Sequence, residues 1–466
     1  MNIVIKGGKI VNHNGIFVGD ILIKNEKIEK VNKNLHYKVT NIKTYDARNC
    51  FVLPGLVDPH VHMGFCSGEF ISSDTFETGS RGAAFGGVTT IIDFAVPTKD
   101  EPLDLALERR LKEASGQCNV DYHIHVAITQ LRETLPEEID RCIEYGVSAF
   151  RLYMVYPGLG LDLEKLYVIF NMLQKKNCIV RIHAENYEFI KAREEELIKS
   201  KLTSPYYHYV SRPEFVEEAA VATILILQRE TKCPVYFNHL STKASLELIK
   251  IAKRNNQKVF AEVCLPYLFF TNKEYKKPNG FLYLASPSFK KEKDKNALWK
   301  GLFTGVADTI GTDHCPFTTE QKKRYSKDFR FVPNGLPGVE NTLPILFTEW
   351  VKRKRPLEKL VELVSYNPSR IFGLYPQKGS IQPGADADIV ILNPEIEWEV
   401  TPHKLHMNVD WTPYDGFKCL GKISTVILRG RVLIENGEWV GPSGLGQFIQ
   451  SLQKTRMIRR SKSVRR

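Results

Sequence analysis

The sequence predicts an α/β protein in which a (β/α)8 barrel of the TIM type carries a small β-sandwich domain. Three observations lead to this prediction. Short apolar segments alternate with helical segments through the middle of the chain, which is typical of a parallel sheet. The two ends contain short strands and turns instead. The length of 466 residues exceeds the roughly 250 residues of a simple barrel and leaves room for a second unit.

The two ends of the chain have the character of one β domain. Residues 1–54 contain short strands punctuated by glycine and asparagine turns. Residues 375–445 continue this pattern, with a buried strand expected over Ile389–Leu392 and a hairpin over Thr425–Val440. Because the first segment cannot close a core alone, we expect the two ends to pair into a single domain.

Residues 55–374 are expected to form the barrel. Helical patterns lie between its strands, for example over Leu163–Gln174, Pro213–Glu230 and Lys243–Asn255. The eight expected strands cover residues 51–58, 88–94, 120–126, 149–153, 179–183, 235–239, 259–263 and 310–313. Eight strand–helix units favour a closed barrel, and the active site of such a barrel lies at the carboxyl ends of its strands.

The net charge of +12 is concentrated at the carboxyl terminus, where residues 454–466 hold seven basic residues and no acidic one. We expect residues 446–466 to be a solvated basic tail. The rest of the chain has no basic stripe interleaved with aromatic residues, so the sequence does not indicate a nucleic-acid-binding protein.

Cysteine usage and hydropathy predict a cytoplasmic protein. The nine cysteines are scattered and form no CxxC pair, so no disulfide framework is expected. The first residues do not place a basic segment before an apolar one, and no signal peptide is expected. No window approaches the roughly 18 uninterrupted apolar residues of a membrane helix, so no membrane contact is predicted.

Five residues at strand ends form a pattern typical of a divalent-metal site. His60 and His62 end the first strand, and residues two apart in an extended chain point the same way. His183 ends the fifth strand, His239 the sixth and Asp313 the eighth. A single histidine at a strand end is more often a hydrogen-bonded structural residue. The ordered set, however, favours a site for zinc or another divalent metal.

Several longer motifs resemble the amidohydrolase superfamily, in its branch of dihydropyrimidinases and hydantoinases. The resemblance covers about residues 1–445. The motifs are Gly55-Leu-Val-Asp-Pro-His-Val-His, Arg81-Gly-Ala-Ala-Phe-Gly-Gly-Val-Thr-Thr-Ile-Ile-Asp-Phe, His183-Ala-Glu-Asn, His239-Leu-Ser-Thr-Lys, Gly311-Thr-Asp-His-Cys-Pro-Phe, Asn334-Gly-Leu-Pro-Gly-Val-Glu and Asn367-Pro-Ser-Arg-Ile-Phe-Gly-Leu-Tyr-Pro. The resemblance implies hydrolysis of the amide bond of a cyclic ureide, either a dihydropyrimidine or a 5-substituted hydantoin, by a homo-oligomer (dimer or tetramer).

The resemblance also assigns roles to individual residues. In the family, a hydroxide held by two metal ions attacks the ring carbonyl. Asp313 matches the aspartate that moves the proton to the leaving nitrogen. Tyr156 matches a tyrosine that donates a hydrogen bond to the developing oxyanion, with simple packing as the alternative. Ser286 and Asn334 match positions whose backbone groups hold the ureide edge of the ring.

Arg151 departs from the family pattern. Family members usually carry a lysine at this position, and its carbamate bridges the two metal ions. A guanidinium stays protonated and cannot form a carbamate. We therefore expect one ion per chain rather than two, held by His60, His62 and Asp313, with His183 as a further candidate. Arg151 could instead point away from the site or pair with Asp313.

The loops 64–73 and 157–162 are expected to flank the exocyclic group of the substrate. Phe65, Phe70 and Leu159 would form an apolar lid there, which favours a bulky or apolar substituent, although packing on neighbouring loops is an equal alternative.

Two alternatives to this function stay open. An allantoinase-like cyclic amidase shares much of the pattern. An inactive family scaffold would explain the loss of the lysine, although such scaffolds typically lose histidine ligands as well. Dihydroorotases carry an arginine just after the His-x-His pair, whereas Met63 and Gly64 follow it here.

Overall fold

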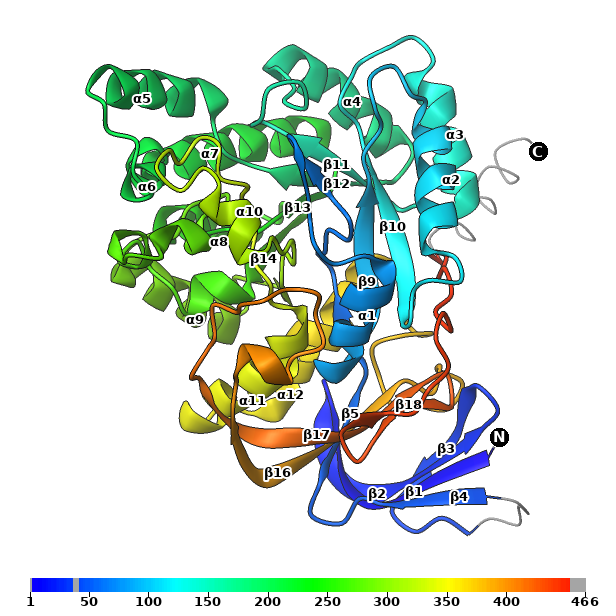
Figure 1. Cartoon of the computed structure of the whole chain (residues 1–466). Helices are drawn as coiled ribbons and strands as arrows, with labels where there is room; N and C mark the ends of the chain where they lie inside the picture. Colours follow the sequence, from blue (N-terminus) through cyan, green and yellow to red (C-terminus); the bar gives the residue numbers. More distant parts are fainter. Residues whose placement is uncertain (1, 37–41, 453–466) are drawn as a thin grey trace, which may run out of the picture.

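The computed structural model describes residues 2–36 and 42–452, and within these residues it contains the expected barrel. Its parallel strands follow the order β15-β14-β13-β12-β11-β10-β9-β6 (Figure 1). Their bounds are β6 (Leu56–Asp58), β9 (Val88–Ala95), β10 (Asp121–Ala127), β11 (Ala149–Tyr153), β12 (Ile179–His183), β13 (Val235–Phe237), β14 (Val259–Cys264) and β15 (Thr309–Gly311). The predicted fold class is confirmed.

The first and last barrel strands are joined just beyond their carboxyl ends. Val61 and His314 form a parallel bridge, and the backbone N–H of His62 donates to the carbonyl of His314 at 2.8 Å. Asp58 accepts hydrogen bonds from both the hydroxyl and the backbone N–H of Thr312. These contacts close the barrel and bring the ends of the first and eighth strands together.

The predicted first barrel strand, residues 51–58, is two strands in the structure. β5 (Phe51–Pro54) pairs with strands of the β domain, whereas β6 pairs with β9. The chain changes sheets at Gly55. A Cβ atom at this position would lie 2.0 Å from Oγ1 of Thr89, so the close approach to β9 requires glycine.

Helices surround the barrel, and the predicted helical segments are found. Their bounds are α1 (Phe76–Phe85), α2 (Leu103–Ala114), α3 (Leu135–Tyr145), α4 (Leu163–Lys175), α5 (Tyr187–Lys199), α6 (Tyr206–Ser211), α7 (Glu214–Thr231), α8 (Lys243–Arg254), α9 (Glu292–Thr304), α10 (Thr319–Lys323), α11 (Thr342–Lys352), α12 (Leu357–Val361) and α13 (Asn367–Ile371). In the described ranges no helix combines the length and the apolar composition that crossing a membrane requires.

Helix α8 illustrates how the outer helices form and pack. The side chain of Thr242 caps its amino terminus by accepting a hydrogen bond from the N–H of Ser245. Leu246, Ile249 and Ala252 are spaced three apart, lie on one face and are buried. The apolar face therefore covers the barrel strands, and Lys253 in the basic last turn pairs with Asp308 at 2.6 Å.

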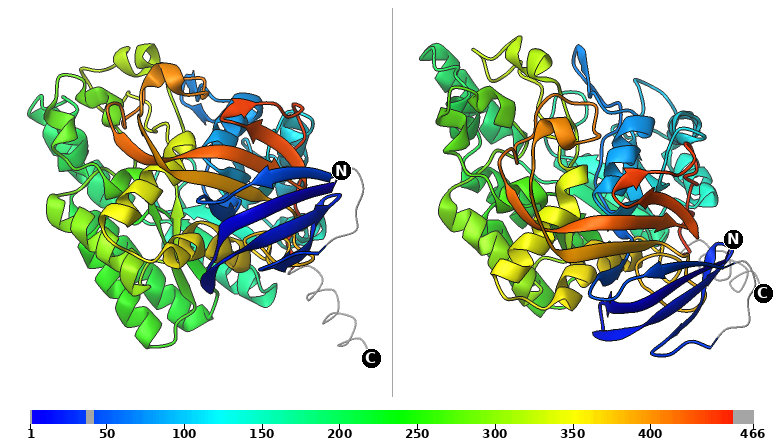
Figure 2. Two further views of the ribbon diagram at one scale, coloured as in Figure 1. Left: turned by 90° about the horizontal axis from the view of Figure 1, so that it is seen from below. Right: turned by 60° about the horizontal axis from the view of Figure 1, so that its bottom comes forward.

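The two ends of the chain form one mainly antiparallel sheet, as predicted. The order is β19-β18-β17-β16-β5-β1-β2-β3, with β4 also paired to β1, so that β5 joins the two ends (Figure 2). The remaining bounds are β1 (Asn2–Asn12), β2 (Gly15–Lys24), β3 (Lys27–Asn32), β4 (Ile42–Asp46), β16 (Ile389–Glu399), β17 (Lys418–Leu428), β18 (Arg431–Glu435) and β19 (Glu438–Trp439). Ile3 and Ile21 share a buried core with Ile389 and Ile427, so the two parts of the sheet pack on each other.

A buried ionic cluster fastens the β domain to the barrel. The Nζ atom of Lys378 lies 2.5 Å from Asp121, which begins β10, and 3.0 and 2.7 Å from Asp386 and Asp388. Burial acts against the charge of Lys378, but the three carboxylates outweigh it and raise the pKa of the amine. Pairing of this kind makes burial of the lysine tolerable.

Residues 446–452, at the start of the predicted tail, pack against the barrel. Phe448 forms a parallel bridge with Tyr122 of β10, and the N–H of Ile449 donates to the carbonyl of Tyr122 at 2.8 Å. The basic residues of the predicted tail, from Lys454 on, lie outside the described residues.

Candidate metal centre and active site

The predicted ligands gather at the carboxyl ends of the barrel strands. His60 and His62 follow β6, His183 ends β12, His239 follows β13 and Asp313 follows β15. They surround the floor of a cavity of about 240 Å³. Among the residues expected at the site, those that line the cavity are His62, Arg151, Tyr156, His183, Ser286, Asp313 and Asn334. His60 and His239 are fully buried beneath it.

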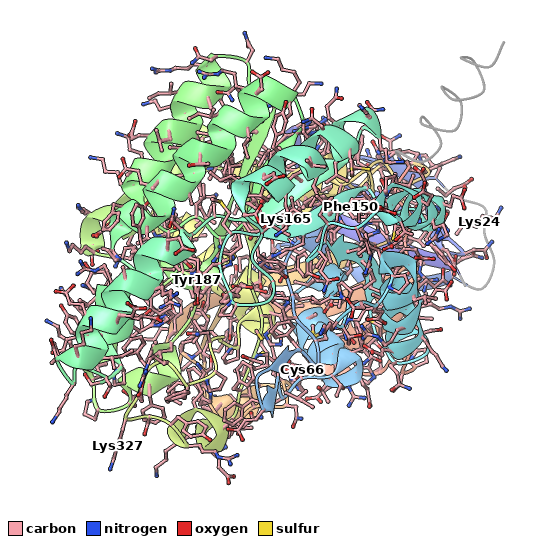
Figure 3. The ribbon with its side chains drawn as sticks, turned by 90° about the horizontal axis from the view of Figure 1, so that it is seen from above. Lys24, Cys66, Phe150, Lys165, Tyr187 and Lys327 are labelled. Atoms are coloured by element: carbon pink, nitrogen blue, oxygen red, sulfur yellow. The ribbon has the colours of Figure 1, made fainter. Side chains whose placement is uncertain are left out.

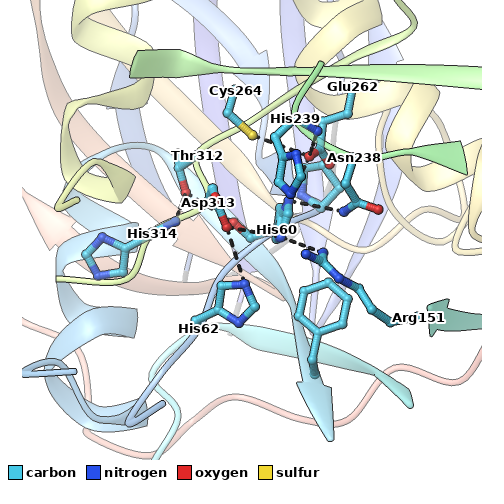
Figure 4. Close-up of polar contacts among 12 residues, drawn as sticks. His60, His62, Arg151, Asn238, His239, Glu262, Cys264, Thr312, Asp313 and His314 are labelled. Carbon is cyan, nitrogen blue, oxygen red and sulfur yellow. Dashed lines mark hydrogen bonds and ion pairs between the residues drawn. The ribbon is translucent and has the colours of Figure 1, made fainter. Parts of the chain in front are cut away.

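His60, His62 and Asp313 form the tightest group of donors. Their ligand atoms all lie within 4.8 Å of one another. The Oδ1 atom of Asp313 lies 3.1 Å from Nε2 of His60 and 3.3 Å from Nε2 of His62 (Figure 4). Two imidazoles and a carboxylate at this spacing are a donor set that a divalent ion accepts.

His183 and His239 form a second pair of donors. Their ring centroids are 4.3 Å apart, and the ring of His239 lies 5.4 Å from that of His60. Nε2–H of His183 donates to Glu185 at 2.8 Å, which leaves Nδ1 as the nitrogen with a free lone pair. Both ring nitrogens of His239 are buried without a hydrogen-bond partner. Orphaned buried polar atoms are rare, and a metal ligand accounts for them.

The electrostatics of the site favour neutral imidazoles beside an ionised carboxylate. Burial lowers the pKa of His239 to about 3 and holds those of His60 and His183 below their ordinary range. Burial alone would raise the pKa of Asp313, but the neighbouring histidines outweigh burial and lower it. Metal binding requires these protonation states of imidazole and carboxylate.

Three of the site residues have a strained backbone. The φ angles of Tyr156, His239 and Asp313 are 77°, 35° and 53°. Non-glycine residues rarely adopt positive φ angles, and such strain is concentrated at functional sites, where the surrounding structure maintains it. The strained backbone turns these side chains toward the cavity end of the barrel.

Arg151 neither points away from the site nor pairs with Asp313. Its Nη1–H donates to Nε2 of His60 at 2.7 Å (Figure 4). Its guanidinium lies over the rings of Phe94 and Tyr153 at 4.7 and 5.1 Å. Within the part of the chain that the structure describes, no carboxylate forms an ion pair with Arg151. A cation therefore lies beside His60, at the residue for which the resemblance implies a bridging lysine carbamate.

Lys165, the lysine that follows the fourth barrel strand in the sequence, does not line the cavity. Lys165 begins the next helix, where its Nζ pairs with Asp162 at 2.6 Å on the exposed surface (Figure 3).

The cavity wall combines apolar and polar groups. Tyr156 lies 5.2 Å from the ring of His183, and burial raises the pKa of its hydroxyl, which therefore stays a hydrogen-bond donor. The Oδ1 atom of Asn334 is buried without a partner. Phe65 and Leu159 line the cavity as expected.

Phe70 does not line the cavity and packs on neighbouring loops, which is the alternative that the sequence left equally open. Its short hairpin, β7 (Cys66–Ser67) and β8 (Phe70–Ile71), presents Cys66 to the cavity. Phe70 turns the other way and packs with Cys315 and Phe317.

Glu262 is the main residue that sequence reasoning missed. Its buried carboxylate accepts hydrogen bonds from Nδ1 of His60 at 2.7 Å, from the backbone of His239 at 3.0 Å and from the hydroxyl of Tyr236 at 2.7 Å. It also pairs with Arg181 at 3.3 Å. The available signal was an acidic residue inside an apolar strand, which is costly unless it is paired.

Comparisons with known proteins agree with this geometry. The model of the amidohydrolase family matches residues 51–433. The chain is 36% identical over 454 residues to a D-phenylhydantoinase of Escherichia coli O17:K52:H18 (strain UMN026 / ExPEC), an alignment that covers 97% of this chain and 98% of that protein.

Solved structures give the same result. A dihydropyrimidinase from Brevibacillus agri NCHU1002 superposes with a TM-score of 0.94 at 31% identity, covering 97% of this chain and 99% of that one. A D-hydantoinase (dihydropyrimidinase) from Thermus sp. has a TM-score of 0.94 at 30% identity, covering 96% and 99%. The chain therefore belongs to the amidohydrolase family, in its dihydropyrimidinase and hydantoinase group of cyclic amidases.

Proposed function

We propose that this hydrolase opens the amide bond of a cyclic ureide, a dihydropyrimidine or a 5-substituted hydantoin, with one divalent ion per chain, zinc or a similar metal. The observation that carries the proposal is the group of five predicted ligands around the floor of the 240 Å³ cavity. The names of the relatives support the substrate class. The guanidinium of Arg151 beside His60 supports a single ion.

Each side chain of the site has a separate role in ring opening. When bound, the ion supplies Lewis acidity, which lowers the pKa of water from about 15.7 toward about 7. Asp313 takes a proton from the attacking water and returns it to the leaving ring nitrogen. Tyr156, which keeps its proton because burial raises its pKa, donates to the oxygen that gains negative charge. Ser286 and Asn334 hold the ureide edge of the ring.

Metal analysis combined with turnover tests this proposal. The purified protein is expected to hold one equivalent of metal per chain by elemental analysis. Dihydrouracil or a 5-substituted hydantoin should be opened, as seen by loss of ring absorbance and appearance of the carbamoyl product. Two equivalents of metal in the wild-type protein would contradict the single-ion proposal.

Arg151→Lys tests whether the residue at position 151 sets the number of bound metal ions. It restores an amine that can form a carbamate in bicarbonate buffer, so a second equivalent of metal is expected. Arg151→Gln removes the charge without supplying an amine, and so separates the two possible causes of a second equivalent. A second equivalent in both variants assigns the effect to loss of the guanidinium, whereas a second equivalent in Arg151→Lys alone assigns it to the carbamate. Ring opening of allantoin alone would favour the allantoinase-like alternative. Ring opening by neither wild type nor Arg151→Lys on any cyclic ureide would favour an inactive scaffold.

We also infer a cytoplasmic, homo-oligomeric protein. All nine cysteines are free and seven of them are buried, which supports a reducing compartment. The family resemblance supports a dimer or a tetramer. Light scattering on the full chain would give the mass of the assembly, and a monomer would contradict this inference.

A further inference from the structure

We propose that the single ion sits on the His183–His239 side of the site and that His60 is not one of its ligands, because Arg151 has taken the place of an ion at Nε2 of His60. This inference rests on one part of the proposed function, namely that the chain binds a divalent ion. It differs from the expectation drawn from the sequence, in which His60, His62 and Asp313 hold the ion.

Both ring nitrogens of His60 are already engaged. Nδ1–H donates to Glu262 at 2.7 Å, so Nε2 carries the lone pair. That lone pair accepts a hydrogen bond from Nη1 of Arg151 at 2.7 Å. Asp313 approaches the same nitrogen at 3.1 Å. The lone pair of His60 and the carboxylate of Asp313 repel each other unless a positive charge lies beside them. The guanidinium of Arg151 supplies that charge.

Arg151 is packed and hydrogen-bonded on several sides. Its side chain is 2% exposed and lies over the rings of Phe94 and Tyr153. With its amide oxygen toward the arginines, Asn238 accepts from Nη1 of Arg151 and from Nη2 of Arg181, each at 2.7 Å. Arg151 and Arg181 are also direct partners in the register of β11 and β12. The guanidinium is therefore held against His60 from several directions.

An ion at Nε2 of His60 would have to share this space with the guanidinium. No carboxylate of the described residues pairs with Arg151, and Asp313, 3.1 Å from Nε2 of His60, would have to offset the charge of both cations. Coulomb energies at such short range are large in a buried site. Occupancy by Arg151 and occupancy by metal exclude each other at this nitrogen.

The opposite side of the site has donors without partners. Both nitrogens of His239 are buried and unpartnered, and its ring lies 4.3 Å from that of His183. Glu185 holds His183 through Nε2 and leaves Nδ1 available. These two imidazoles offer the lone pairs that His60 no longer offers.

A matched pair of substitutions tests the assignment. His60→Asn keeps a donor for Glu262 at the position of Nδ1 and removes Nε2, and His239→Asn makes the same change at the other imidazole. Zn²⁺ content by elemental analysis and the visible spectrum of the Co²⁺-loaded protein are measured on the full chain. His60→Asn should keep one equivalent and the wild-type spectrum. His239→Asn should lose more than about 100-fold in affinity, since even indirect partners of a metal contribute about 10–100-fold.

Loss of metal from His60→Asn, or its retention by His239→Asn, overturns the assignment. Arg151→Met gives an independent check that does not depend on a histidine variant folding. It frees Nε2 of His60 and should raise the metal content from one equivalent to two, and His60→Asn in the same chain should return it to one. A content that stays at one in Arg151→Met overturns the role given to Arg151. Wild-type protein that binds no metal contradicts the proposed function as well, whereas metal binding that depends on His60 contradicts this inference alone.

Discussion

Nη1 of Arg151 lies 2.7 Å from Nε2 of His60, and this contact fixes a permanent positive charge at the floor of the cavity. Few acidic side chains of the cavity wall are present to balance this positive charge. Asp313 is the one acidic side chain among the described residues that line the cavity. It therefore has to serve both as a counter-charge to the cations of the site and as the group that moves a proton.

The proposed proton transfer by Asp313 predicts the effect of Asp313→Asn. Asparagine keeps the shape and one acceptor oxygen but cannot take a proton. We expect kcat to fall by about 10²–10⁴, with a smaller change in KM, because general acid–base catalysis contributes about that factor. Steady-state ring opening of a hydantoin measures both constants.

A buried aspartate outside the site is the control for Asp313→Asn. Asp294 lies in α9 and caps the N–H of Lys243, far from the ligands in the sequence and absent from the cavity wall. Asp294→Asn should leave kcat unchanged. If Asp313→Asn keeps kcat within tenfold of the wild type, another group moves the proton.

The proposed hydrogen bond from Tyr156 predicts a loss in Tyr156→Phe. Phenylalanine keeps the packing against His183 and removes only the hydroxyl. Loss of one donor to a developing oxyanion typically costs about 10²–10³ in kcat. Tyr187→Phe is a suitable control, because Tyr187 packs in the same apolar cluster and does not line the cavity. Equal kcat values for the two variants would assign Tyr156 a packing role.

The barrel and the positions of the five candidate ligands could be predicted because both depend on local sequence pattern. Strand ends place His60, His62, His183, His239 and Asp313 at one end of the barrel whatever the details of packing. Side-chain direction beyond the strand ends depends on tertiary packing. The sequence therefore identified the residue at position 151 but not its contact with His60, which is set by the rings and amides around it.

The dependence of side-chain direction on tertiary packing also explains why the sequence did not identify Glu262 and did not settle where Phe70 packs. Glu262 lies in a strand of apolar neighbours, and its partners come from β6, β12 and β13, which are distant in sequence. Phe70 lies in a hairpin of two short strands, and its packing partners come from a segment distant in sequence. The predicted strand over residues 51–58 is divided at Gly55, where the backbone passes close to Thr89. This contact depends on the folded chain and has no signal in the local sequence.

The central position of Glu262 predicts a large loss of stability in Glu262→Gln. The amide can still accept a hydrogen bond, but it no longer offsets the charge of Arg181, which is fully buried. Removing one partner of a buried ion pair costs about 3–5 kcal/mol. The free energy of unfolding from urea titration measures this loss.

Glu247→Gln serves as the comparison for Glu262→Gln. Glu247 is exposed on α8, where it lies 3.8 Å from Lys250, and exposed pairs contribute about 0–1 kcal/mol. Equal unfolding free energies for the two variants would mean that Glu262 does not hold the site together.

The lowered pKa of Lys322 predicts how the free energy of unfolding depends on pH. Its amine is fully buried, donates to the carbonyl of Leu284 at 3.0 Å and has a pKa that burial lowers to about 7. Between pH 7 and the ordinary lysine pKa of about 10.4, the unfolded chain binds a proton that the folded chain does not. The contribution of this group to the free energy of unfolding therefore rises with pH across that window, by up to about 1.4 kcal/mol per pH unit. Below pH 7 the charged amine stays buried and its full cost is present.

Lys322→Met removes the titrating group and keeps an apolar side chain of similar length. Urea unfolding at several pH values from 7 to 10 should show a shallower rise of the unfolding free energy than in the wild type, with the largest gain in stability at pH 7. The carbonyl of Leu284 keeps a partner, since it also accepts from the N–H of Gly335. Lys323→Met, at the exposed neighbouring position, should keep the wild-type slope. Identical slopes for the wild type and Lys322→Met would show that Lys322 is protonated in the folded chain throughout, because only then does its burial leave no dependence on pH in this range.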